Sequence, residues 1–142
     1  MKKAALFLLL FSIFTFNSFS QAEKTLTIEI TNVVPEGGAV HVAVFFNAEE
    51  LRNEKPRYGF ELEAGSTAVS RTVTLPHGDY VITGFQDANH NQKMDYAFLR
   101  LPKELVGLTN YYGKGIPSMN FDRLKVTVNS TTEKISVGLY KF

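Results

Sequence analysis

The chain has 142 residues, which is enough for one ordinary domain and too few for two. It carries 15 basic and 14 acidic residues, and this balance excludes the basic footprint that a nucleic-acid-binding protein presents. It contains no cysteine, so no disulfide bond can stabilise it in any compartment.

The N-terminal twenty residues have the pattern of a secretory signal. Lys2 and Lys3 form a short basic start, and an apolar run follows over residues 4–16. This run is too short to cross the roughly 30 Å hydrocarbon core of a bilayer as a helix, so it favours a cleaved signal over a membrane anchor. We predict a signal peptide at residues 1–20, with cleavage after Ser20 or Ala22.

The predicted location is therefore exported, either periplasmic or extracellular, with no stable membrane span after cleavage. Loss of Lys2 and Lys3 leaves 13 basic residues against 14 acidic ones, so the mature chain is close to neutral. We expect residues 21–142 to form a single domain, with a protein or a glycan as its unknown partner and no nucleic acid.

Six short segments of this domain alternate apolar and polar residues, or are apolar on both faces, as strands do. They lie at residues 26–30, 40–46, 69–75, 80–86, 124–128 and 135–139. Both faces of the segment 40–46 are apolar, which predicts a central strand. Arg71 interrupts the apolar face of the segment 69–75.

The connections between these segments predict short helical turns and one long loop. Asn47 is followed three positions later by Glu50, which is typical of a helix start. Residues 102–105 begin with Pro102 and predict a single helical turn, and residues 107–118 predict an exposed loop. The fold class is therefore all-β, an antiparallel Ig-like or transthyretin-like β-sandwich of about seven strands. A small closed barrel is the alternative.

One loop carries the clearest chemical pattern in the chain. Directly after the strand at 80–86, short oxygen-bearing side chains recur at relative positions 1, 3, 5 and 9. Such spacing lets a curling loop direct several oxygens at one hard cation, with a main-chain carbonyl at position 7. The predicted calcium ligands are Asp87, Asn89, Asn91, Lys93 (through its main-chain carbonyl) and Asp95.

Calcium takes six to eight oxygens, so the predicted site needs a further donor. Glu104 is the nearest acidic residue downstream. Two positions differ from a helix-flanked calcium hand, because Gln92 stands at position 6 instead of glycine and Phe98 at position 12 instead of glutamate. The alternative is a metal-free turn in which the Asp and Asn side chains bind their own backbone.

Two other functions are compatible with the sequence. Tyr111 and Tyr112 stand in a glycine-rich stretch and could present an aromatic surface to a glycan or a peptide; alternatively, they fold back over the edge of the core. A hydrolase that uses the Asp87 loop as its metal centre is the other possibility. The three histidines form no recognisable catalytic spacing, so we predict a domain that is not an enzyme.

The residues 78–110 also resemble a known family. The Gly78-Asp79-Tyr80 strand, the loop that closes on Asp95, the Pro102-Lys103-Glu104 segment and the Gly107-to-Asn110 stretch are similar to the domain of unknown function 2141, a family of small exported bacterial proteins. The resemblance extends over the mature chain. Gln92 stands where that family often has glycine, and Leu108-Thr109 replaces Phe-Ser.

The resemblance implies an exported domain whose loop and Pro-x-Glu segment belong together, which supports Glu104 as the further donor. The loop is also similar to those of calcium-binding β-sandwich repeats in bacterial surface adhesins. Because the resembled family has no established activity, the prediction remains a structural calcium loop in a domain with a binding or structural role.

Overall fold

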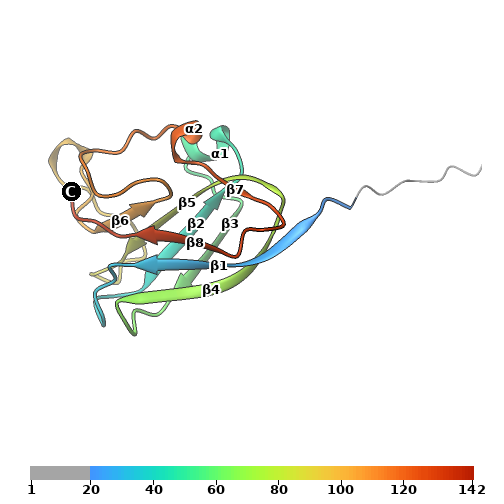
Figure 1. Cartoon of the computed structure of the whole chain (residues 1–142). Helices are drawn as coiled ribbons and strands as arrows, with labels where there is room; N and C mark the ends of the chain where they lie inside the picture. The colour runs from blue at the N-terminus through green and yellow to red at the C-terminus, as the bar shows by residue number, and fades with distance from the viewer. Residues whose placement is uncertain (1–19) are drawn as a thin grey trace, which may run out of the picture.

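The computed structural model describes residues 20–142, whose strands form two sheets packed face to face (Figure 1). The elements in chain order are β1 (Glu23–Thr31), β2 (Val40–Phe45), α1 (Ala48–Arg52), β3 (Tyr58–Leu62), β4 (Ala68–Pro76), β5 (Gly78–Gln86), the 3-10 turn η1 (Phe98–Arg100), β6 (Leu105–Leu108), α2 (Phe121–Leu124), β7 (Val126–Val128) and β8 (Lys134–Gly138). One sheet has the order β4-β1-β8, and the other the order β3-β2-β5-β6, with β7 also paired to β5.

The all-β sandwich prediction is confirmed. The strands divide between two sheets, so the alternative of a closed barrel is not formed. One pairing departs from the predicted antiparallel arrangement, because β1 and β8 run parallel (Figure 1). Parallel neighbours need a long crossover, and here the chain between the first and the last strand supplies it.

Aliphatic side chains from both sheets fill the space between them. Ile28 and Ile30 of β1, Val40 and Val44 of β2, and Ile82 of β5 are all 0% exposed. Alternate residues of each strand reach this inner core, as the period of two in the sequence requires. The inner core therefore holds the two sheets together.

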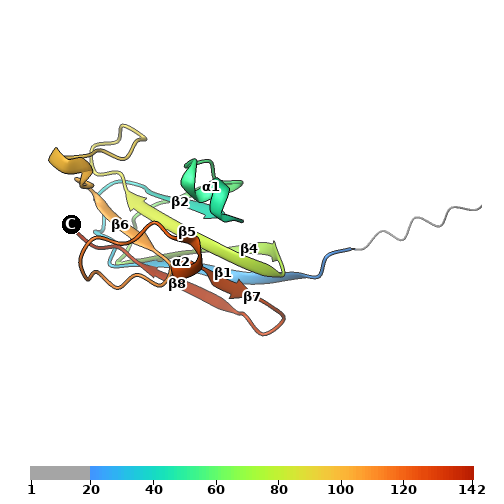
Figure 2. The same cartoon turned by 90° about the horizontal axis from the view of Figure 1, so that it is seen from above.

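The opposite face of the larger sheet carries a second apolar cluster. Phe45 of β2, Val81 of β5 and Val106 of β6 lie on this outer face, and Leu51 of α1 packs against them. Helix α1 and the segment after β5 both project on this side of the sheet (Figure 2). The prediction of a central strand with two apolar faces is confirmed, since β2 lies between β3 and β5.

Helix α1 begins where the sequence predicts. The Asn47 side chain accepts the Glu50 N–H at 2.9 Å, and the Glu50 carboxylate accepts the Phe46 N–H at 2.8 Å. These two bonds satisfy donors that a helix start leaves free. The cap thereby fixes the helix that delivers Leu51 to the outer cluster.

The predictions for residues 102–105 and for the start of the 107–118 loop are wrong. Residues 102–105 form no helical turn: Pro102 makes an isolated β-bridge with Tyr96, and β6 begins at Leu105. Pairing with β5 takes precedence over the local pattern, because residues 105–108 lie opposite β5 in register. Gly107 is needed in this strand: a Cβ there would lie 2.5 Å from the Gly138 carbonyl oxygen.

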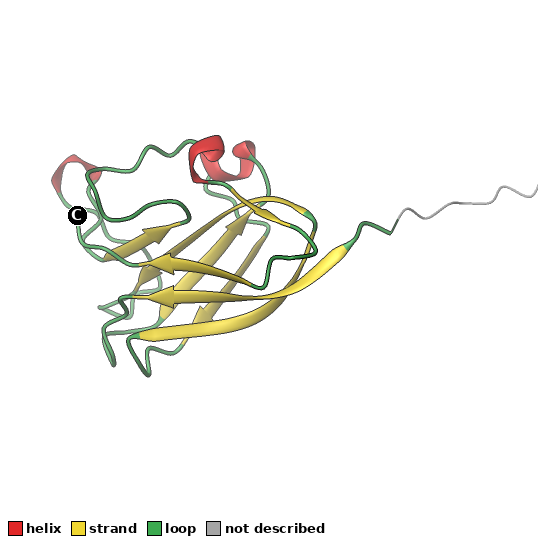
Figure 3. Cartoon of the chain, in the orientation of Figure 1, coloured by secondary structure: helices red, strands yellow, loops and turns green. Residues whose placement is uncertain are grey.

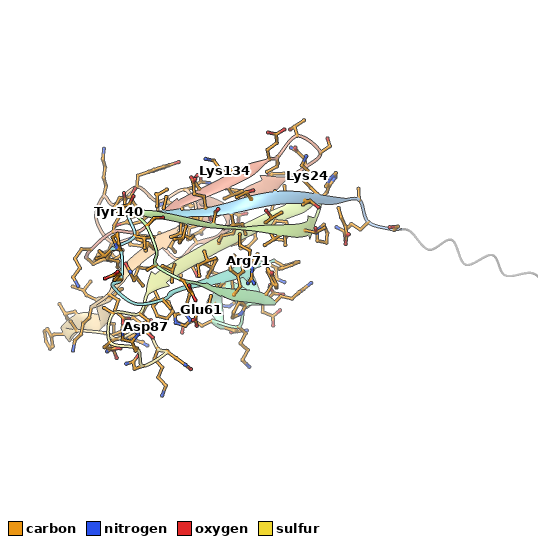
Figure 4. The ribbon with its side chains drawn as sticks, turned by 90° about the horizontal axis from the view of Figure 1, so that it is seen from below. Lys24, Glu61, Arg71, Asp87, Lys134 and Tyr140 are labelled. Atoms are coloured by element: carbon orange, nitrogen blue, oxygen red, sulfur yellow. The ribbon has the colours of Figure 1, made fainter. Side chains whose placement is uncertain are left out.

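Two other elements differ from the prediction. The strand β3 was not predicted, and α2 occupies the start of the predicted strand 124–128, where Asn120 caps the helix by accepting the Arg123 N–H. A long loop joins β6 to α2 (Figure 3). Arg71, labelled in Figure 4, is exposed on β4, and its guanidinium carbon lies 5.2 Å from the centroid of the Phe60 ring of β3.

The predicted signal peptide falls outside the described residues except for Ser20. Among the residues that the structure does describe, no helix combines the length and the hydropathy needed to traverse a bilayer.

Candidate metal centre

The loop after β5 is coiled around the carboxylate of Asp87. This side chain is 2% exposed, and its two oxygens accept the N–H of Asn91 at 3.2 Å and the N–H of Gln92 at 2.7 Å. The Asp87 N–H donates to the Ala39 carbonyl at 2.8 Å, which extends the pairing of β5 with β2 by one residue. The first residue of the loop is therefore anchored to the sheet while its side chain organises the turn.

The electrostatic environment of Asp87 favours its charged form. Burial alone would raise the pKa of this carboxyl, but the hydrogen bonds from the Gln92 and Asn91 backbones, together with nearby His41 and His90, hold the pKa below its usual value. A carboxylate that accepts backbone N–H groups is stabilised as an anion. Asp87 is therefore a charged oxygen donor at neutral pH.

The backbone of the loop adopts the curl that its spacing predicts. His90 and Gln92 have φ angles of +59° and +61°, in the left-handed region. Gln92 stands where calcium hands place a glycine, and it adopts a conformation that glycine would take most easily. The substitution at position 6 therefore leaves the path of the loop in place.

Three oxygen-bearing side chains converge at the open side of the loop. The Asn89 and Asn91 amide groups donate to the same Asp95 carboxylate oxygen, at 2.5 and 2.9 Å. The Asn91 side-chain oxygen accepts the Lys93 N–H at 2.9 Å, so Lys93 belongs to the same curl. The side chains at positions 3, 5 and 9 therefore meet, whereas Asp87 at position 1 is linked to them through the Asn91 N–H and Lys93 at position 7 through its own N–H.

Glu104 joins this cluster from the next hairpin. Its Oε2 accepts the Asp95 N–H at 3.1 Å, and the Lys103 N–H donates to the Asp95 carbonyl at 2.8 Å. Glu104 is only 6% exposed, and its other oxygen, Oε1, has no hydrogen-bond partner among the described residues. A buried carboxylate oxygen without a partner is costly, so this atom is available to a cation.

His41 lies beside the loop, and no pattern in the sequence indicates this. Its Nε2 lies 3.6 Å from an Asp87 oxygen, its Nδ1 lies 3.6 Å from a Glu61 oxygen, and its ring stacks on Phe85 with the centroids 4.9 Å apart. Asp87 and Glu61 are both labelled in Figure 4. The register of β2 against β5 brings these residues together, pairing His41 with Phe85, and local spacing carries no information about it.

Besides the carboxylates, the oxygen atoms of the loop that could bind a cation belong to neutral groups. Within residues 20–142, no group of three or more His, Asp or Glu side chains is close enough to hold one metal ion. A cation in this loop would therefore draw on the amide oxygens of Asn89 and Asn91 and on main-chain carbonyls as well as on carboxylates. Such a mixed set of hard oxygen donors is the set that calcium accepts.

Comparison with known families supports the resemblance of the 78–110 region. A family model described as "Uncharacterized protein conserved in bacteria (DUF2141)" matches residues 28–136, from within β1 to within β8. The chain belongs to the DUF2141 family. No curated protein and no solved structure matched the chain. The description of DUF2141 names no activity, so the function of this member has to be argued from its own residues.

The two adjacent tyrosines of this DUF2141 chain have different surroundings. Tyr111 is 9% exposed, stacks on Phe142 with the centroids 5.7 Å apart and donates its hydroxyl to the Gly115 carbonyl; burial raises the pKa of this hydroxyl. Tyr112 is 73% exposed. Both line a hollow of about 420 Å³ beside β7 and β8, whose other lining residues include Thr127, Thr132 and Lys134.

Proposed function

We propose that this DUF2141 protein is an exported, non-catalytic β-sandwich in which calcium fastens the 87–95 loop to the start of β6. The observation that carries the proposal is the convergence of Asn89, Asn91 and Asp95 beside Glu104. Calcium would replace the amide N–H donors now directed at Asp95, and the amide oxygens, which now accept the Asn91 and Lys93 N–H groups, would turn toward the ion. The unpartnered Oε1 of Glu104 would then gain a partner.

The proposed role is structural, because the donors connect two segments of the chain. Asp87 is anchored to the end of β5, whereas Glu104 immediately precedes β6. A donor set that combines carboxylates with neutral amide oxygens indicates moderate rather than tight affinity. The export part of the proposal rests on the sequence pattern of residues 1–20.

Thermal unfolding with and without calcium tests the proposal. At a free calcium concentration a hundredfold above the dissociation constant, binding should stabilise the fold by about 2.7 kcal/mol, which corresponds to a rise in Tm of roughly 5–10 °C. The measurement is melting by circular dichroism in calcium and in chelator, with calorimetric titration of calcium into the chelated protein. Equal melting curves and no binding heat would refute the metal site.

A pair of variants distinguishes calcium binding by Glu104 from a general effect of surface charge on calcium affinity. Glu104→Gln keeps an acceptor for the Asp95 N–H but removes a charged donor, and it should weaken calcium binding by about tenfold. Glu63→Gln removes an exposed charge outside the loop and should leave calcium affinity unchanged. Equal affinities in both variants would show that Glu104 is not a donor.

A second candidate function is glycan or peptide binding at the hollow lined by Tyr111 and Tyr112. The exposed Tyr112 ring beside polar residues of β7 and β8 favours it, because aromatic faces with polar neighbours bind sugars and peptides well. Screening on a glycan array, repeated with Tyr112→Ala, tests this function. Signals that are unchanged in the variant would exclude Tyr112 from binding.

A further inference from the structure

A groove of about 570 Å³ lies on the outer face of the larger sheet. Its floor consists of outward-facing side chains from three neighbouring strands: Phe45 of β2, Phe85 of β5, and Val106 and Leu108 of β6. The volume is within the range of roughly 300–1,000 Å³ that small-molecule sites occupy. The floor is thus a continuous apolar surface with the size of a ligand site.

The walls of the groove are apolar side chains that remain largely in solvent. Leu99 and Ile116 are each 76% exposed, and Met119 is 57% exposed, although all three line the groove. Folded proteins rarely leave several large apolar side chains together in water unless they bind something. Methionines such as Met94 and Met119 adapt their shape to an apolar occupant.

One wall is a hairpin with an unusual backbone. Leu99 and Arg100 are consecutive non-glycine residues with φ angles of +64° and +58°, and the Ala97 N–H donates to the Leu101 carbonyl at 2.7 Å. Left-handed conformations of such residues are unfavourable and persist where the surroundings require them. Here they form the compact hairpin tip that places Leu99 and Arg100 along the groove.

Two oppositely charged residues line the groove, Arg100 on the hairpin and Glu54 after α1, and His41 of β2 also lines it. Arg100 and Glu54 both line the groove and both influence the Tyr96 hydroxyl, whose pKa is raised chiefly by burial and further by Glu54, against the effect of Arg100. Among the ion pairs of the described residues, none includes Arg100. The groove is therefore mostly apolar, and Arg100 on its hairpin wall has no ion-pair partner among the described residues.

We propose that this groove binds a single-chain amphiphile, with the apolar chain on the β2-β5-β6 floor and an anionic carboxylate head at Arg100. A concave site with walls on two sides suits one flexible chain. A protein partner would instead need a broad surface of about 800 Å² per side. Glu54 also lines the groove and repels an anionic head group. Arg100 should therefore raise the affinity for the amphiphile, and Glu54 should lower it.

The test uses protein expressed from the full sequence and purified in the form that the host produces. A fluorescent probe, dansylated undecanoate, is bound and then displaced by octanoate, decanoate, dodecanoate and decylammonium, each below its micelle concentration. Each added methylene should tighten binding by up to about fourfold until the groove is filled. Decylammonium should displace the probe less well than decanoate.

Variants of the two exposed wall residues test the location. Leu99→Ser and Ile116→Ser should each weaken decanoate binding several-fold, and two separate variants guard against a folding defect in either. Val34→Ser, at an exposed apolar residue outside the groove, should leave binding unchanged. Arg100→Gln should weaken binding up to about fivefold, and Glu54→Gln should tighten it.

Three results would overturn the proposal. The first is no displacement by any chain length. The second is displacement that is equal in Val34→Ser and in both wall variants, which would place the probe elsewhere. The third is binding to phosphatidylcholine vesicles with no binding of free decanoate, which would make the apolar wall a membrane contact instead of a ligand site.

Discussion

The two faces of the larger sheet are made by the same strands but have different partners. The inner face meets a second sheet, and residues such as Val44 and Ile82 are 0% exposed there. The outer face meets a short helix and loops, which leave Phe85 and Met94 partly exposed beside the groove. The second sheet closes the inner face completely. The short helix and the loops cover the outer face only in part, and the groove remains between them.

This difference shows how alternation along a strand separates stability from binding. Val81, Thr83 and Phe85 face outward, and Tyr80 and Ile82 face the inner core. A change on the inner face should reduce stability, and a change on the outer face should act mainly on what the surface binds. Three further experiments examine this division, from the largest expected effect to the smallest.

Ile82→Ala should lower the free energy of unfolding by about 3 kcal/mol, because the cavity would lie between two sheets that cannot collapse around it. The matched control is the next residue, Thr83→Ala, which faces outward and should change stability by less than about 1 kcal/mol. Urea denaturation measures both. Equal losses in the two variants would show that the outer cover packs as tightly as the inner core.

Removal of calcium should weaken decanoate binding by roughly fivefold, since Asp95 and Glu104 hold the base of the hairpin that carries Leu99 and Arg100. The measurement is probe displacement in calcium and in chelator. The decanoate affinity of Glu104→Gln should depend less on calcium than that of the original protein. If calcium binds and leaves decanoate affinity unaltered, the loop and the groove wall act independently.

Glu50→Gln should lower stability at pH 7 by roughly 0.5–1 kcal/mol, because it weakens the cap that holds α1 over the outer face. Burial would raise the pKa of Glu50, but the Phe46 N–H and the Arg57 guanidinium lower it below 4.5 in the folded state. A lowered folded-state pKa gives stability above pH 4.5 that is lost as the pH falls further.

The difference in the free energy of unfolding between Glu50→Gln and the original protein should therefore stay constant from pH 7 to pH 5 and shrink between pH 5 and pH 3. Glu49→Gln, one residue earlier and exposed, should alter stability by only a few tenths of a kcal/mol over the same range. A Glu50→Gln effect that stays constant down to pH 3 would contradict the charged cap.

Sequence alone predicted the elements whose pattern is local. Alternation identified β1, β2, β4, β5 and β8, and the Asn47 and Glu50 pair identified the start of α1. In each of these, the residues that interact are neighbours or share one strand face. Glu104 was singled out as the nearest acidic residue downstream and through the family resemblance, and the structure joins it to the Asp95 N–H.

The remaining features depend on pairing between distant segments. Residues 105–108 form a strand because β5 is beside them, and His41 approaches Asp87 because β2 pairs with β5 in one register. The groove is made by β2, β5, β6 and α1 together with loop residues around positions 54–56, 94–102 and 116–119. A period or a motif cannot indicate such convergence, since the residues are neighbours only after folding.

The parallel pairing of β1 with β8 has a consequence for how the chain reaches its folded state. Ile28 lies beside Ile135, so the central strand of the smaller sheet acquires its second neighbour only from the last residues of the chain. Until then β1 has an open edge, which other chains could pair with. Contacts so distant along the chain make folding slow, and a chain shortened before β8 should aggregate instead of forming a smaller sandwich.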